Sequence, residues 1–313
     1  MQEKSSTPCF DGAAKMIRKS ASGQEADFFV RPNILFSYFW RFKAKENTMN
    51  QPLAYIHPNA KIAEDVKIEP FAWIGEDVEI GEGTWIGPNV TIMDGARIGK
   101  NCKIFPGAVV SAIPQDLKYK GETTYCIIGD GTTIRESATV NKGTMASGKT
   151  VVGKNCLLMA FTHVAHDCYL GDNVIMANAA TLAGHITVGD WAIFGGLSAV
   201  SQFVHIGAHV MISGGAMVNK DIPPFVRTGT GYPISYAGVN SIGLGRRGFS
   251  RERINAIQDI YRVIYSVGMN VSQSVQYIKE NLPESEDRQF IIDFIENSKI
   301  GIMKNSVTSS NEV

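Results

Sequence analysis

Four residues that could do acid–base chemistry lie within 23 positions of the chain, namely His163, His166, Asp167 and His185. A neutral imidazole, whose ordinary pKa is about 6.5, can accept a proton near neutral pH. A carboxylate at its other ring nitrogen fixes the tautomer and stabilises the imidazolium that forms. Asp167 follows His166 directly, although the carboxylate in this role need not be the sequence neighbour. The cluster predicts a general base.

Apolar residues recur at every sixth position around this cluster. They are Ile56, Ile62, Ile68, Ile74, Ile80, Ile86, Ile92, Ile98, Ile104 and Val110, and later Val152, Leu158, Val164, Leu170, Met176, Leu182, Val188, Phe194, Val200, Ile206 and Ile212. A period of six is too long for a helix and is three times the period of a strand. Hexapeptide repeats of this kind predict a parallel β-helix.

If three hexapeptides form one triangular coil, residues 18 apart stack along one edge of a prism. Two columns then contain the cluster: His166, Gly184 and Gln202 form one, and Asp167, His185 and Phe203 form the other. Successive coils should lie about 4.8 Å apart. Because Gly184 has no side chain, its N–H could face a developing oxyanion beside the base. The column contains no serine or cysteine that could act as a nucleophile, because the position of Cys168 in the hexapeptide repeat points its side chain inward. Direct attack by a substrate hydroxyl in an acyl transfer is therefore favoured.

A metal site is the alternative interpretation of the cluster. His166, His185 and a histidine of a neighbouring copy could be arranged like the three zinc ligands of γ-class carbonic anhydrases, which are also β-helices. A one-carbon substrate explains neither the polar stretch at 112–126 nor the helical C-terminus. Acyl transfer is therefore preferred, and neither a metal nor another cofactor is expected.

Two stretches interrupt the repeat. AIPQDLKYKGETTYC at 112–126 replaces one coil's worth of sequence with polar residues and predicts a projecting loop. ASGK at 146–149 is a smaller interruption.

Of the histidines outside the cluster, His57 is expected to be a surface residue, while His205 and His209 are left unassigned.

The remaining sequence predicts the domain organisation. The expected parts are a poorly ordered extension at 1–48, the β-helix at 49–224, a linker at 225–248, a helical domain at 249–305 and a tail at 306–313. Apolar residues return at helical spacing in three groups, which are Ile254, Ile257, Tyr261 and Ile264; Val275, Ile278 and Leu282; and Phe290, Ile291, Phe294 and Ile295. The fold class is therefore mainly β, a parallel β-helix followed by a small α-helical domain. Such helices would cover the last coil, which would otherwise be an open sheet edge.

Composition excludes several classes of protein. The 30 Lys and Arg balance the 30 Asp and Glu, so the chain has no electrostatic footprint for nucleic acid. No apolar run reaches the roughly 18 residues that a transmembrane helix needs. The cysteines show no CxxC spacing, and Cys102, Cys156 and Cys168 fall where small core residues are expected. Unpaired cysteines in the core fit a cytoplasmic protein.

At HVAHDC, TLAGH, AVSQF, GAHVM and GVN…GLGRRGFSRE, the sequence resembles the UDP-N-acetylglucosamine acyltransferases of lipid A biosynthesis, over about residues 54–300. The resemblance implies a left-handed β-helix, an exception to the right-handed crossover rule. It implies a homotrimer with sites between subunits. The implied reaction transfers an (R)-3-hydroxyacyl group from acyl carrier protein to the 3-hydroxyl of UDP-N-acetylglucosamine, the first step of lipid A synthesis.

The resemblance also assigns roles to residues. His166 matches the general base, Asp167 its neighbour and Gly184 the backbone donor to the oxyanion. The implied substrate-binding residues are Gln115, Asp116, Lys118, His163, His185, Gln202, Asn240, Arg246 and Arg247. Gly214 matches the position that limits acyl length, and its lack of a side chain should leave a long groove. Arginine suits the geometry of a nucleotide phosphate.

The chain departs from the family pattern in three places. Ser201 stands where His often precedes Gln, Ile242 replaces an acidic residue, and residues 229–236 differ enough that no contacts are assigned there. One rival is the related N-acyltransferase that acts on the glucosamine 2-amine, but residues 1–48 look too short for its N-terminal domain. Another is a non-catalytic hexapeptide-repeat scaffold that binds nucleotide sugars.

Overall fold

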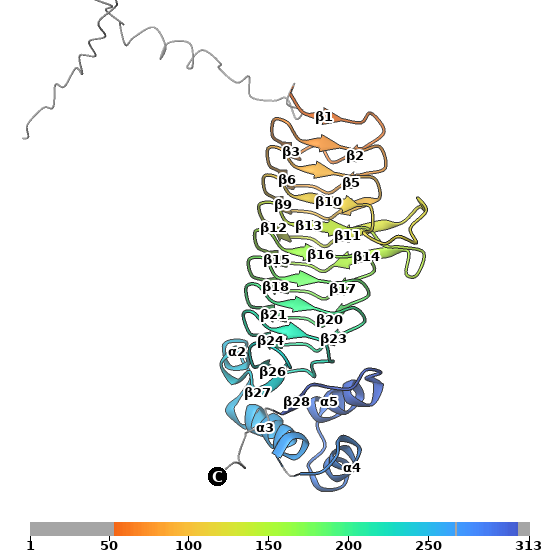
Figure 1. Cartoon of the computed structure of the whole chain (residues 1–313). Helices are drawn as coiled ribbons and strands as arrows, with labels where there is room; N and C mark the ends of the chain where they lie inside the picture. Colours follow the sequence, from red (N-terminus) through yellow and green to blue (C-terminus); the bar gives the residue numbers. More distant parts are fainter. Residues whose placement is uncertain (1–52, 267, 306–313) are drawn as a thin grey trace, which may run out of the picture. The chain divides into compact units, whose positions relative to one another are not determined.

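A computed structural model describes residues 53–266 and 268–305. The expected N-terminal extension at 1–48 and tail at 306–313 lie outside these residues. Between β1 and β25 the chain passes in turn through three parallel sheets, so that every third strand returns to the same sheet (Figure 1). Four helices follow in sequence: α2 (Ser241–Arg246), α3 (Arg251–Ser266), α4 (Val271–Asn281) and α5 (Glu286–Asn297).

The strands are short and follow the hexapeptide period. The first sheet contains β1 (Tyr55–Ile56), β4 (Trp73–Ile74), β7 (Thr91–Ile92), β10 (Val109–Ala112), β13 (Thr139–Asn141), β16 (His163–Val164), β19 (Thr181–Leu182), β22 (Ala199–Val200) and β25 (Met217–Val218). The second sheet contains β2 (Lys61–Ile62), β5 (Glu79–Ile80), β8 (Ala96–Ile98), β11 (Tyr125–Ile128), β14 (Lys149–Val152), β17 (Tyr169–Leu170), β20 (Thr187–Val188) and β23 (His205–Ile206). The third sheet contains β3 (Lys67–Ile68), β6 (Trp85–Ile86), β9 (Lys103–Ile104), β12 (Thr133–Ile134), β15 (Leu157–Leu158), β18 (Ile175–Met176), β21 (Ile193–Phe194), β24 (Met211–Ile212), β26 (Val226–Thr228), β27 (Ser235–Val239) and β28 (Lys304–Asn305).

The predicted register of 18 residues is confirmed. Val164 pairs with Leu182, which pairs in turn with Val200. From β3 to β25, the repeated apolar residue of each strand points inward and is buried. The free cysteines Cys102 and Cys168 are also buried, as expected for core residues. Stacking of identical coils therefore builds one continuous apolar core, as in other solenoids.

Both interruptions lie where the chain passes from the first sheet to the second, here called the first–second edge. The projecting loop is confirmed as residues 113–124 between β10 and β11, but it does not replace a coil. Because β10 and β11 belong to successive sheets, the chain turns a single corner over this stretch. Residues 142–148, between β13 and β14, form a second loop at the same edge, and Figure 1 shows both loops projecting on one side.

The C-terminal helices form largely as predicted. In α3, Ile254, Ile257, Tyr261 and Ile264 are buried, and the Tyr261 hydroxyl donates to the Pro224 carbonyl oxygen (2.6 Å). In α5 the expected apolar face is shifted, because Ile292 is buried while Phe290 is exposed. Residues 225–248, expected to be a linker, contain β26, β27 and α2. Within the described residues, none of the helices combines the length and the apolar character needed to cross a membrane.

Candidate active site

The histidine cluster lies at the first–second edge, where β16 turns into β17. Both predicted columns are present, since the His185 N–H donates to the His166 carbonyl oxygen (3.1 Å) and the Phe203 N–H to that of Gly184 (3.3 Å). Asp167, His185 and Phe203 have positive φ angles of 59°, 63° and 65°. Left-handed residues recur at the other edges too. The backbone strain therefore belongs to the corners of the coil in general and is not particular to this site.

His166 and Asp167 form a buried pair. His166 Nδ1 lies 2.8 Å from Asp167 Oδ2, and the two side chains are 7% and 0% exposed. Because a carboxylate only accepts hydrogen bonds, Nδ1 carries the proton and the lone pair is on Nε2. The carboxylate that orients the base is therefore the sequence neighbour. Nε2 is the atom that can accept a substrate proton.

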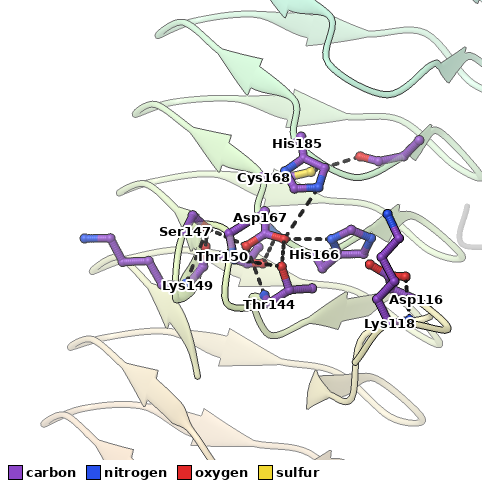
Figure 2. Close-up of polar contacts among 12 residues, drawn as sticks. Asp116, Lys118, Thr144, Ser147, Lys149, Thr150, His166, Asp167, Cys168 and His185 are labelled. Carbon is purple, nitrogen blue, oxygen red and sulfur yellow. Dashed lines mark hydrogen bonds and ion pairs between the residues drawn. The ribbon is translucent and has the colours of Figure 1, made fainter. Parts of the chain in front are cut away.

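The Asp167 carboxylate is held by the loop at 142–148 (Figure 2). It accepts hydrogen bonds from the Thr144 N–H (2.9 Å), the Thr144 hydroxyl (2.7 Å) and the Ser147 hydroxyl. Burial by itself would raise the pKa of Asp167. The hydrogen bonds from Ser147, Thr144 and His166 outweigh burial and lower this pKa from 3.8 to about 2. Asp167 is thus a carboxylate at every pH at which the base could work.

Gly184 lies directly against the base. A Cβ at this position would lie 2.6 Å from His166 Cε1 and 2.8 Å from Nε2, so any side chain here would force the His166 ring to move. The Gly184 N–H has no hydrogen-bond partner among the described residues, whereas the amides of Ala183 and His185 on either side are paired. An amide without a partner among the described residues and a proton acceptor thus lie on adjacent coils of one edge, an arrangement that suits acyl transfer.

The other two histidines flank this pair. His185 stacks on Phe203 (centroids 4.7 Å apart) and meets His166 edge to face (5.1 Å). His163 projects outward from β16, with its Nδ1 2.7 Å from the Thr139 hydroxyl. Burial, together with the charge on a protonated His166, lowers the pKa of His163. His163 is therefore held as a neutral hydrogen-bonding group beside the base.

A metal could be held only by breaking this network. One ligand atom from each of His166, Asp167 and His185 lies within 4.8 Å of the others, which is close enough for a shared ion. However, His166 Nδ1 and Asp167 Oδ2 already bond to each other, and Thr144 and Ser147 donate to the same carboxylate. The donor set fits a hydrogen-bonded base better than a zinc site.

Three of the predicted substrate-binding residues belong to the projecting loop at the same edge. Gln115 and Lys118 are exposed, and the Lys118 N–H donates to Asp116 Oδ1 (2.9 Å). Leu117 between them is fully exposed. Gln202 is exposed at the edge, one coil beyond Gly184. The structure thus brings these residues and the three histidines to one edge.

The remaining predicted residues lie at other edges. Asn240 caps α2: its side chain accepts from the Gly243 N–H (3.3 Å) and donates to the His209 carbonyl oxygen (3.0 Å). Arg247 covers the Trp191 ring (5.2 Å) at the turn from the second sheet to the third, whereas Arg246 is exposed.

Gly214 lies between β24 and β25, where the third sheet passes to the first. A Cβ there would touch only the Gly196 backbone, at 3.3 Å from its carbonyl oxygen. Within one chain, then, the base, the arginines and Gly214 occupy three different edges.

Sequence reasoning did not identify Thr144, Ser147, Thr150 or Thr139 as parts of the site. The sequence feature that could have pointed to the loop residues is the interruption at 146–149. Counting hexapeptides places this interruption at the same edge as the histidines. Thr150 Oγ1 accepts from the Asp167 N–H (2.9 Å), so the neighbouring coil also holds the Asp167 backbone.

Taken together, a hexapeptide-repeat β-helix with a histidine base and a free amide at one edge defines a transferase of the hexapeptide class. Residues 149–184 match the bacterial transferase hexapeptide profile, and residues 221–303 match that of UDP-N-acetylglucosamine O-acyltransferase, domain 2. Residues 50–151 match the profile of the GMPPB C-terminal domain.

Individual relatives narrow the class. Two proteins named acyl-[acyl-carrier-protein]–UDP-N-acetylglucosamine O-acyltransferase, from Stenotrophomonas maltophilia and Xylella fastidiosa, are 44% and 43% identical to this chain. The matches cover 81% and 83% of this chain and 97% and 99% of those relatives. The UDP-N-acetylglucosamine acyltransferase structures from Bacteroides fragilis and Francisella novicida both give a TM-score of 0.80, at 48% and 38% identity, over 82% and 84% of this chain and 100% and 96% of theirs. The chain belongs to the UDP-N-acetylglucosamine O-acyltransferase family, and its β-helix is left-handed.

Proposed function

We propose that this chain transfers an (R)-3-hydroxyacyl group from acyl carrier protein to the 3-hydroxyl of UDP-N-acetylglucosamine, the first step of lipid A synthesis, in the cytoplasm. The relatives' names supply the two substrates. The observation that carries the chemistry is the contact between His166 Nε2 and Gly184, with Nδ1 anchored on Asp167. No cofactor takes part in this reaction.

The reaction follows from that contact. His166 Nε2 takes the proton of the sugar hydroxyl as its oxygen attacks the thioester carbonyl carbon, and the Gly184 N–H donates to the oxyanion. Collapse of the tetrahedral intermediate breaks the carbon–sulfur bond, and the His166 imidazolium returns the proton to the leaving thiolate of the carrier protein. The base contributes about 10²–10⁴ in rate and the oxyanion donor about 10²–10³.

The assigned residues divide between the two substrates. The surroundings of the base His166 are formed by His163, His185 and Gln202. The projecting loop, which contains Gln115, Asp116 and Lys118, lies at the same edge. Arg246, exposed in the last turn of α2, suits a nucleotide phosphate. The Asn240 side chain is used in capping α2, so its contribution is to orient that helix.

The active form is proposed to be a homotrimer with sites between subunits. The base, the arginines and Gly214 occupy different edges of one prism, so a single substrate can meet all three only if neighbouring copies supply them. The third sheet also has partly exposed aliphatic side chains pointing outward, namely Leu157, Ile175, Ile193 and Met211. Such a stripe fits a surface covered by another copy. Gly214 has no side chain to limit the length of an acyl chain, which favours a long one.

Acyl transfer from a 3-hydroxyacyl carrier protein to UDP-N-acetylglucosamine, followed by mass spectrometry, tests the function. Wild type should form the 3-O-acyl product, and His166→Ala should lose turnover about 10³-fold while trimer and nucleotide binding remain. His57→Ala, at a surface histidine, is the matched control and should behave as wild type. Intact wild-type trimers without any transfer would indicate a scaffold, and product only on the 2-amine acceptor would indicate the N-acyltransferase.

A further inference from the structure

The loop between β13 and β14 donates three of the four hydrogen bonds that the Asp167 carboxylate accepts, and His166 donates the fourth. An ionised carboxylate offers about four lone-pair positions on its two oxygens. Oδ1 accepts from the Thr144 N–H and the Ser147 hydroxyl, and Oδ2 accepts from the Thr144 hydroxyl and His166 Nδ1. The carboxylate thus has one orientation in which all its partners are satisfied. Figure 2 shows Ser147 on the side of Asp167 away from His166 and Thr144 below Asp167.

This arrangement distinguishes the two adjacent histidines. His185 Nε2 lies 3.8 Å from Asp167 Oδ2, too far for a hydrogen bond, whereas His166 Nδ1 lies at 2.8 Å. If the carboxylate rotated, His185 could compete for it and His166 would lose its tautomeric lock. The loop donors therefore decide which histidine Asp167 orients.

The loop at 142–148 is held together by contacts of its own. Its neck is closed because a Cβ on Gly143 would lie 2.3 Å from the Lys149 backbone nitrogen, so only glycine fits there. The Gly148 N–H donates to the Thr144 carbonyl oxygen (2.7 Å). The Ser147 hydroxyl has a second acceptor in reach, the Lys149 carbonyl oxygen at 2.8 Å. Its single proton goes preferentially to Asp167, since an ionised carboxylate is the stronger acceptor.

We propose that Thr144 and Ser147 are positioning residues for the reaction: they aim Asp167 at His166 and so keep the base in its Nδ1–H tautomer with Nε2 free. This inference rests on the proposed function of His166, because it assigns to the loop the orientation of that base. Neither hydroxyl needs to touch a substrate. The depressed pKa of Asp167 is consistent with the same set of donors.

Variants of the full chain that remove or keep each hydroxyl test the proposal. Ser147→Ala should lower kcat about tenfold and Thr144→Val with Ser147→Ala about a hundredfold, with KM for the nucleotide sugar within about twofold. Ser147→Thr keeps the hydroxyl and should retain at least a third of the wild-type kcat. Thr132→Val is the matched control, because this buried hydroxyl donates to the Gly153 carbonyl oxygen (2.8 Å) and accepts from the Cys156 N–H (3.0 Å), and has no hydrogen bond to Asp167. It should leave kcat unchanged.

A spectroscopic measurement separates this proposal from the proposed function. In ¹⁵N NMR at pH 8, the wild-type His166 ring should have the signature of the Nδ1–H tautomer, and the double variant should show a mixture with Nε2–H. This readout does not depend on turnover, so it holds even if wild type transfers no acyl group. Unchanged tautomer signals in the double variant, or an equal loss of kcat in Ser147→Thr and Ser147→Ala, would overturn the positioning role.

Discussion

His166 gains its proposed reactivity from residues supplied by three different parts of the chain. Asp167 comes from the same corner, Gly184 from the next coil, and Thr144 and Ser147 from an inserted loop. None of these contacts depends on an unusual residue type. They depend on the coil spacing, which brings the ring of His166 and the Gly184 backbone into van der Waals contact.

Gly184→Ala tests that contact at the scale of one methyl group. The added Cβ would lie 2.6 Å from His166 Cε1, so the ring must move away from the amide donor. We expect kcat to fall at least about a hundredfold, while nucleotide binding measured by calorimetry is kept. Gly245→Ala is the control, because no atom lies within 4 Å of a Cβ there. Wild-type turnover in Gly184→Ala would rule out the proposed geometry.

At the scale of elements, a stacked column joins the last coils to the C-terminal segment. The rings of Trp191, His209 and Phe225 stack along the second–third edge, with Phe249 edge-on to His209. Burial, followed by the nearby Arg247, lowers the pKa of His209 from 6.5 to about 4. His209 Nδ1 is buried without a hydrogen-bond partner among the described residues. Protonation at this position therefore works against the packed column.

This shift predicts acid sensitivity of the packed column. Between pH 6.5 and about 4 the unfolded chain binds a proton at His209 that the folded chain does not. The contribution of neutral His209 to the free energy of unfolding is complete above pH 6.5. As the pH falls towards 4 this contribution is lost, which lowers the free energy of unfolding by at most about 3 kcal/mol. His209→Phe, which the left-handed corner accepts as it does at Phe225, should reduce the loss of Tm between pH 7.5 and 4.5.

The pKa of Asp167 is also lowered, but this shift affects stability only at lower pH and does not contribute to the measurement on His209. Its pKa is lowered from 3.8 to about 2, so its contribution is kept above pH 3.8 and lost only below it. The comparison of wild type and His209→Phe by calorimetry above pH 4.5 therefore reports on His209. An identical fall in Tm for both proteins would contradict the assignment.

At the scale of the whole molecule, the residues with proposed roles lie at three different edges of one prism. Mixed trimers test whether neighbouring copies share a site. His166→Ala and Arg246→Ala should each be nearly inactive alone. Co-assembled in equal amounts, they should regain about a quarter of wild-type activity, because that share of sites pairs an intact His166 with an intact Arg246 from another copy. Activity no higher than that of either variant alone would place both residues in one chain's site.

Much of the fold was determined by the sequence alone. A six-residue period leaves only one way to bury the repeated aliphatic side chains, so strand positions, register and core could be predicted residue by residue. The same period placed His166 beside Gly184, because residues 18 apart must stack. The left hand of the helix and the substrates came from family resemblance and not from the period.

Only the tertiary structure decided what the interruptions do. Loop residues have no period, so the sequence could not say how the two loops close, nor that Thr144 and Ser147 bind Asp167. It also could not place the arginines, which lie beyond the repeat, at a different edge from the histidines. The repeat fixes contacts between coils, whereas contacts across an inserted loop depend on how that loop closes in space.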